Sequence, residues 1–218
     1  MPVVEIAWWT PSEAYLADPF ILKPALDFLK KVDGAKNIYS GLSESDTEKT
    51  LFLFIGEIKH REVDLDVNHK CMPVWESYEH HKTLMAHPEY PQIIGLGPSV
   101  GSEVSVNHVN FVKDVDASLS APVTEVLAMT LQEGKTADDF AKAGAAIAEQ
   151  LDIANPTHAP VTWGQTVEDE KKFYTTVGWD SAEKHKEVIT SAPLVPSRTE
   201  LRNTVTFKMN RVKLVKHV

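Results

Sequence analysis

Two histidines at matching places in the chain, His81 and His185, are the residues best suited to acid–base chemistry. A histidine has a pKa near 6.5, so it can act as a base toward a phenol or an acidic C–H bond. Each shares a predicted helical face with apolar residues three and four positions further along. We expect both rings to face the interior, either as a catalytic base or as a core histidine satisfied by one hydrogen bond.

A tyrosine and further polar residues lie close to the first histidine. Tyr78 is three residues before His81, a spacing that makes the two side chains neighbours on a helix. His87 and Tyr90 follow, whereas the second copy has Ala182 in place of Tyr78. This difference fits one active cavity and one structural copy, and it fits equally an exposed polar helix end.

Tryptophans are the candidate binding residues. All five are predicted on strands or at strand ends, where they either line an aromatic pocket or belong to the core: Trp8, Trp9, Trp75, Trp163 and Trp179. The predicted substrate-binding set takes three of these together with two residues from the first half: Trp8, Trp75, His87, Tyr90 and Trp179.

Other common reaction centres have no support in the sequence. His80 and His81 are adjacent and diverge on a helix, and His81 with His87 lacks the spacing of a helical metal pair, so no metal site is expected. The glycine-rich residues 95–101 contain Pro98 and precede no amphipathic helix, which argues against a dinucleotide site.

Composition narrows the class further. The chain has 218 residues and a net charge of −9, which disfavours general binding to nucleic acid. Cys71 is the only cysteine, so an intrachain disulfide is excluded and a reducing, cytoplasmic location is the default. No apolar run has the length of a membrane span, and residues 1–9 predict a strand rather than a signal peptide. The basic tail after Pro196 predicts a solvated strand face.

The elements that must position these residues follow from periodicity and turn signals. Strands are predicted at 3–9, 38–42, 51–58, 104–112, 126–131, 161–167, 172–178 and 204–215. Helices are predicted at about 18–34, 76–86, 136–154 and 180–189. Pro24 either starts or kinks the first helix, and Pro193 and Pro196 break the last one.

An internal repeat organises these elements. Residues 75–82 read WESYEHHK and residues 179–186 read WDSAEKHK, with Trp, Ser, Glu, His and Lys at the same relative positions. Two ferredoxin-like β-α-β-β-α-β repeats are predicted, at 1–115 with an insertion at 59–73 and at 122–218. Each repeat leaves one sheet face bare, so the fold class is α+β, with the two sheets facing each other as an intramolecular barrel around a cavity.

The repeated Trp-containing helix starts and the β-α-β-β-α-β order resemble the dimeric α+β barrel superfamily, in particular the antibiotic biosynthesis monooxygenase-like proteins. Single-repeat relatives build the barrel as homodimers, and this chain looks like a tandem form. The insertion at 59–73 departs from the family pattern and could act as a lid. A dimer of tandem chains is also possible.

The resemblance implies three activities: oxidation of polycyclic phenols by oxygen without a cofactor, cyclisation of polyketides by a His–Tyr pair, and haem degradation. The function expected first is a cofactor-independent monooxygenase with an apolar, aromatic or polyketide-like substrate. His81 or His185 would deprotonate this substrate, and Tyr78 would orient its oxygen. A cyclase or isomerase, a haem protein with His81 or His87 as axial ligand, and a ligand-binding stress protein are the alternatives.

Overall fold

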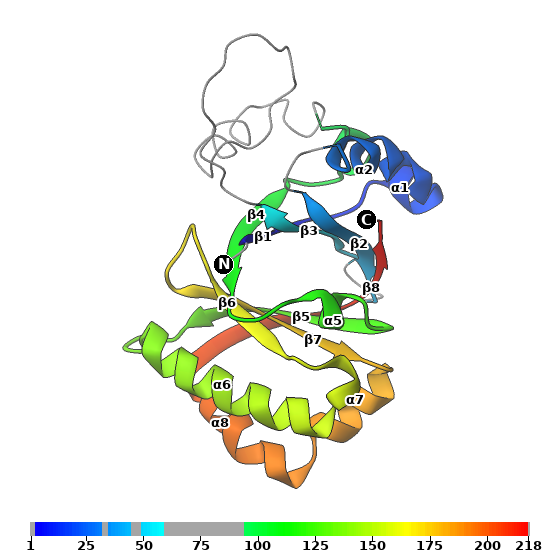
Figure 1. Cartoon of the computed structure of the whole chain (residues 1–218). Coiled ribbons are helices and arrows are strands. Elements are labelled where there is room, and N and C mark those ends of the chain that lie inside the picture. The colour runs from blue at the N-terminus through cyan, green and yellow to red at the C-terminus, as the bar shows by residue number, and fades with distance from the viewer. Residues whose placement is uncertain (1–2, 32–34, 45–48, 59–93, 218) are drawn as a thin grey trace.

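The computed structural model describes residues 3–31, 35–44, 49–58 and 94–217. Within it, eight antiparallel strands form a closed barrel in the order β1-β3-β2-β8-β5-β7-β6-β4 (Figure 1). The first four strands in the sequence are β1 Val3–Trp9, β2 Lys36–Ser43, β3 Leu51–Ile58 and β4 Ser105–Phe111. The next four are β5 Val123–Leu131, β6 Thr162–Thr166, β7 Lys172–Trp179 and β8 Val205–Lys216. The predicted α+β class and the barrel are therefore confirmed.

Around the barrel, the first and last four strands follow the same relative order, β4-β1-β3-β2 and β8-β5-β7-β6. The two sets meet along β2–β8 and along β4–β6. The second seam is short, because its ladder runs only from Val109 opposite Thr166 to Phe111 opposite Gly164.

Side chains fill the middle of the barrel. Strand residues alternate between the two faces of a sheet, so every second residue points inward. The inward residues are mainly aromatic and β-branched, and they form one buried cluster that includes Ile6, Tyr39, Phe54, Val126 and Tyr174. The barrel is thus a packed core over most of its length.

Helices cover the two outer faces of the barrel (Figure 1). The first face packs against α1 Glu13–Ala17, η1 Pro19–Leu22 and α2 Lys23–Leu29. The second face packs against α6 Ala137–Ala154, α7 Ala182–Ile189, η4 Ala192–Leu194 and α8 Val195–Thr204. The short helices η2 Gly97–Ser99, α5 Asp116–Leu119 and η3 Pro156–His158 lie in the connections.

The predicted helix starts agree with the local chemistry. Thr136 and Asp139 cap α6 reciprocally, as the sequence pattern predicts. Ser181 caps α7 by accepting a hydrogen bond from the backbone N–H of Lys184. Pro24 lies in the first turn of α2, so it begins this helix instead of kinking it.

Helical structure after the last predicted helix was missed. The helix predicted at 180–189 ends at Ile189, before the prolines as expected, but Pro193 and Pro196 each lie in the first turn of a new helix, η4 and α8. A proline in the first turn costs no hydrogen bond, because its missing N–H would have no intrahelical partner. As a result Arg198 and Arg202 lie on a helix, not on the solvated strand face that the basic tail suggested.

No helix in the described ranges is long and apolar enough to cross a membrane.

Candidate functional site

A cavity of about 320 Å³ lies between the second outer face of the barrel and its covering helices. Strands β5 and β7 form its floor, and α6, α7 and α8 form its walls. The sequence predicted a ligand cavity between the sheets, inside the barrel. The structure places this cavity outside the barrel, while large side chains fill the middle of the interior and a further cavity opens at one end of it.

Aromatic and small residues shape the apolar part of this cavity. Phe140 of α6 packs edge-on against Trp163, with ring centroids 5.2 Å apart, and lies 4.2 Å from the ring of Phe173. Gly144, one turn further along α6, faces the indole of Trp163. Gly144 and Thr175 are small residues in the lining, which is mainly ring and aliphatic carbon.

One polar cluster interrupts the apolar wall. The indole Nε1 of Trp179 donates a hydrogen bond of 3.0 Å to Oε2 of Glu125. The Nε2 atom of His185 lies 3.0 Å from the same carboxylate oxygen. The rings of Trp179 and His185 meet edge-to-face at 5.0 Å. Glu125, Trp179 and His185 therefore form one compact unit at the cavity wall.

Burial sets the charges in this cluster. Desolvation raises the pKa of Glu125 to about 7, although the hydrogen bond from Trp179 and the positive charge of Arg211 oppose the rise. Burial lowers the pKa of His185, and Arg211 lowers it further. The histidine is therefore neutral near pH 7, while the glutamate changes its protonation state there. A neutral imidazole beside a titrating carboxyl can accept and pass on a proton.

Local structure explains why these side chains meet. Trp179 is the last residue of β7, and the chain turns at once into α7, which Ser181 caps. His185 lies in the second turn of α7, and Val188, three residues later, is buried on the same side. The structure thus brings two of the predicted residues, His185 and Trp179, to one site.

Helix α8 adds two arginines to the cavity wall, Arg198 and Arg202. The Nη1 atom of Arg198 donates a hydrogen bond to the carbonyl oxygen of Ile189, near the end of α7. This contact satisfies a carbonyl at the helix C-terminus and fixes α8 against α7. Polar groups of opposite sign, Glu125 and the two arginines, thus line one otherwise apolar cavity.

The other predicted site residues lie elsewhere. Trp8 is on the inner side of β1 and lines a separate cavity at one end of the barrel. Five predicted residues lie outside the described ranges: Trp75, Tyr78, His81, His87 and Tyr90. Their roles stay predictions.

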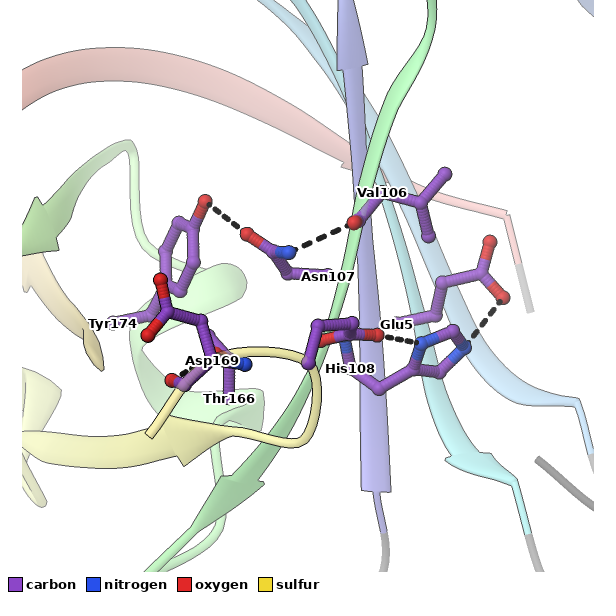
Figure 2. Close-up of polar contacts among 8 residues, drawn as sticks. Glu5, Val106, Asn107, His108, Thr166, Asp169 and Tyr174 are labelled. Carbon is purple, nitrogen blue, oxygen red and sulfur yellow. Dashed lines mark hydrogen bonds and ion pairs between the residues drawn. The ribbon is translucent and has the colours of Figure 1, made fainter. Parts of the chain in front are cut away.

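The first outer face carries its own acid–histidine cluster (Figure 2). Nδ1 of His108 lies 2.6 Å from Oε1 of Glu168, and its Nε2 lies 3.8 Å from Oε2 of Glu5. Burial raises the pKa of Glu5 to about 7, while the nearby His108 lowers it and Glu168 raises it. The adjoining cavity holds only about 10 Å³, too little for any ligand.

Glu5, Glu125 and His108 were not predicted as site residues, although they form most of these two clusters. Each glutamate is the only charged residue in a mainly apolar strand. An isolated carboxylate in such a run is a usable signal, because burying it is costly unless it has partners. In the described part of the chain, no group of three or more histidine, cysteine or acidic residues could hold a metal ion.

Comparisons with known proteins place the fold. No protein-family model matches the sequence, and no curated protein matches it. A candidate monooxygenase from Fusobacterium nucleatum subsp. nucleatum is similar in structure, with a TM-score of 0.62 and 8% identity over 99% of this chain and 93% of that one. An anthrone oxidase-like protein matches with a TM-score of 0.59 and 11% identity over 98% of this chain and 91% of the other.

A candidate chlorite dismutase is also similar, with a TM-score of 0.55 and 14% identity over 99% of this chain and 96% of that one. These likenesses, at 14% identity or less, show that the chain shares the α+β barrel fold of these proteins. The resemblance drawn from the sequence is confirmed at this level.

Proposed function

We propose that the chain is an enzyme that oxidises an apolar, weakly acidic aromatic molecule with molecular oxygen and without a cofactor. The substrate would occupy the cavity between β5, β7 and helices α6 to α8. The observation that carries this proposal is the 3.0 Å contact between Nε2 of His185 and the buried carboxyl of Glu125 at the wall of a mainly apolar cavity. The names of two structural neighbours, a candidate monooxygenase and an anthrone oxidase-like protein, support the same class.

In the proposed mechanism, Glu125 orients and charges the base. Once Glu125 is ionised, the Nε2–H of His185 donates to its carboxylate, which leaves the lone pair on Nδ1. This nitrogen takes a proton from the substrate, and Glu125 stabilises the resulting imidazolium. Trp179 holds the carboxylate in place through its indole N–H. The apolar walls keep water away from the substrate anion.

The oxygen step balances without any further reagent. The substrate carbanion reduces O₂ and forms a carbon–oxygen bond, giving a peroxide that takes back a proton. Loss of water from this hydroperoxide leaves a carbonyl group. The net change converts one CH₂ group and one O₂ molecule into one C=O group and one water molecule.

Oxygen uptake with anthrone as the substrate tests the proposal. We expect His185→Ala to lower the rate by a factor of about 10² to 10⁴, the usual contribution of a general base. Glu125→Gln should remove most of the activity as well, and the wild-type rate should rise with pH through about 7 as Glu125 ionises. Glu5→Gln, which changes a buried carboxyl on the other face, is the matched control. Equal rates in His185→Ala and the wild type would exclude this mechanism.

Haem is the cofactor that the resemblance offers as an alternative. His185 is the one histidine that lines the cavity within the described residues, and its Nε2 faces Glu125. The contact with Glu125 occupies Nε2, so this nitrogen is not free to ligate iron. The residues in this arrangement therefore do not fit axial ligation. A Soret band on adding haemin to wild type, lost in His185→Ala, would contradict this conclusion.

We further propose that residues 1–115 and 122–218 are two copies of one ancestral unit. The matching strand orders support this, as does a buried glutamate at the third position of both β1 and β5. An experimental structure that defines residues 59–93 tests the idea, since a second helix is expected there at 76–86.

A further inference from the structure

A second cavity, of about 370 Å³, opens at one end of the barrel interior, and the proposed oxidation makes no use of it. It lies on the opposite side of β5 from the first cavity. Inward residues of β5 alternate with those that face the helices, so Ala128 and Thr130 point into the barrel while Leu127 and Met129 point away.

Strand register explains why the barrel is hollow at this end. Ala128 pairs with Tyr174 on one side and with Lys208 on the other. Thr130, two residues further, pairs with Lys172 and Thr206. Each cross-strand row thus has a small residue at its centre, which leaves a depression where the rest of the barrel is packed.

Aromatic surface forms the inner end of this depression. The rings of Trp8 and Tyr174 lie 6.0 Å apart at an interplanar angle of 55°. The hydroxyl of Tyr174 donates to Oδ1 of Asn107, and Nδ2 of Asn107 donates to the carbonyl oxygen of Val106 (Figure 2). Because these polar atoms satisfy each other, the inner end offers ring carbon to a ligand.

Cationic side chains stand at the open end. Lys172 and Lys208 come from the strands on either side of β5, and both are exposed. The Nζ atom of Lys172 lies 4.0 Å from Oδ2 of Asp169, a long contact between two solvent-exposed groups. Both lysines have partners in the folded chain, and a small anion at the mouth would add to these contacts an attraction to two positive charges.

We propose that this cavity is a binding site for a small planar aromatic carboxylate. The ring lies against Trp8 and Tyr174, and the carboxylate faces the ammonium groups of Lys172 and Lys208. Thr130 and Thr206 line the wall between them. Ring contact and charge attraction at separate ends fix the orientation of the ligand.

Isothermal titration calorimetry of the full chain with 2-naphthoate tests the site. We expect a Kd of about 1 mM or tighter, the range that a ligand of this size can reach. The double variant Lys172→Gln/Lys208→Gln should weaken binding at least about tenfold, because both attractive charges are removed. Lys142→Gln, which removes an exposed lysine from α6, is the matched control and should bind as the wild type does.

Two further measurements make the result decisive. Neutral 2-naphthamide should bind at least about tenfold more weakly than 2-naphthoate, if the lysines recognise the charge. Val177→Phe narrows the cavity on the other side of the sheet and should leave 2-naphthoate binding unchanged. Absence of binding to the wild type, equal binding to the double lysine variant, or loss of binding in Val177→Phe would each overturn the proposal. Since these changes are read as binding, they are independent of the proposed oxidation.

Discussion

The two outer faces of the barrel carry the same buried group in opposite surroundings. Glu5 is the third residue of β1 and Glu125 is the third residue of β5, and burial raises the pKa of each to about 7. The residue opposite Glu5 on the neighbouring strand is His108, whereas the residue opposite Glu125 is Arg211. One backbone position therefore supports two different charge arrangements.

Space is the second difference. About 10 Å³ lies beside Glu5, whereas about 320 Å³ lies beside Glu125. On the first face His108 is held between two carboxylates, while on the second His185 reaches its carboxylate from the covering helix. The comparison shows that a perturbed pKa alone does not identify a reactive site, because only the second carboxyl adjoins room for a substrate.

The largest expected effect is the pH dependence of folding stability that each buried carboxyl contributes. A carboxyl whose folded pKa is about 7 keeps its proton where the unfolded chain has already lost it, at about 4.5. Stability therefore falls as pH rises from about 4.5 to about 7, by up to about 3 kcal/mol for each carboxyl. We expect Glu5→Gln and Glu125→Gln each to remove their own share of this fall.

Urea unfolding at pH 5 and at pH 8 measures this effect. His185 acts in the opposite direction, because its lowered pKa removes stability as pH falls below about 6.5. The informative quantity is therefore the difference between the wild type and each variant. A variant whose free energy of unfolding falls with pH as steeply as that of the wild type would show that its glutamate is not the buried acid described here.

The next prediction replaces one aliphatic residue by phenylalanine on each face. Ile55 is the neighbour of Glu5 across the strand pair, and Val177 is the neighbour of Glu125. Ile55→Phe should destabilise the fold by about 1–3 kcal/mol, since there is almost no space to accept the larger ring. Val177→Phe should cost less than about 1 kcal/mol and should reduce anthrone turnover strongly, because its ring enters the cavity of about 320 Å³ beside Glu125.

Chemical denaturation of both variants, with the oxygen-uptake assay, measures the contrast. Circular dichroism provides the control that each variant is folded. If Val177→Phe destabilised the chain as much as Ile55→Phe does, the cavity beside Glu125 would be closed in solution.

The barrel was predictable because it depends on patterns that span many residues. The alternation of apolar residues along the strands indicates which residues face inward. A shift of strand register would expose these residues to water, so the pairing is strongly constrained. β1 and β3 have the bounds that the sequence predicted. The helix α8 was not predictable in the same way, because a proline can end one helix or begin the next, and tertiary packing decides between them.

The candidate site was predictable only in part. His185 and Trp179 follow from the repeat, but their shared partner Glu125 is 54 residues away from Trp179 in sequence. Such a contact depends on strand pairing between β5 and β7, which residue types alone do not specify. The cavity is lined by residues of four strands and three helices, and such an assembly has no local sequence signal.

The smallest expected effect concerns the seam that closes the barrel beside the first face. The β4–β6 ladder ends where the backbone N–H of Val167 donates to the carbonyl oxygen of His108. At the next position the carboxylate of Glu168 accepts hydrogen bonds from the backbone N–H of His108, at 3.0 and 3.1 Å, and approaches its ring at 2.6 Å. The carboxylate of Glu168 thus accepts the hydrogen bond that the backbone carbonyl of a further strand residue would otherwise accept.

Glu168→Gln should therefore cost about 1–2 kcal/mol, since hydrogen bonds to a charged group are lost but an amide oxygen can still accept from the backbone. Burial alone would raise the pKa of Glu168, but the hydrogen bonds from His108 outweigh it and lower that pKa. Its stabilisation is thus present above about pH 4.5 and is lost on acidification, opposite in sign to the effect of Glu5. Asp180→Asn, which breaks the exposed pair between Asp180 and His158, is the control and should cost less than about 0.5 kcal/mol. Equal losses in the two variants, measured by urea unfolding at pH 7, would show that Glu168 contributes no more than a surface ion pair.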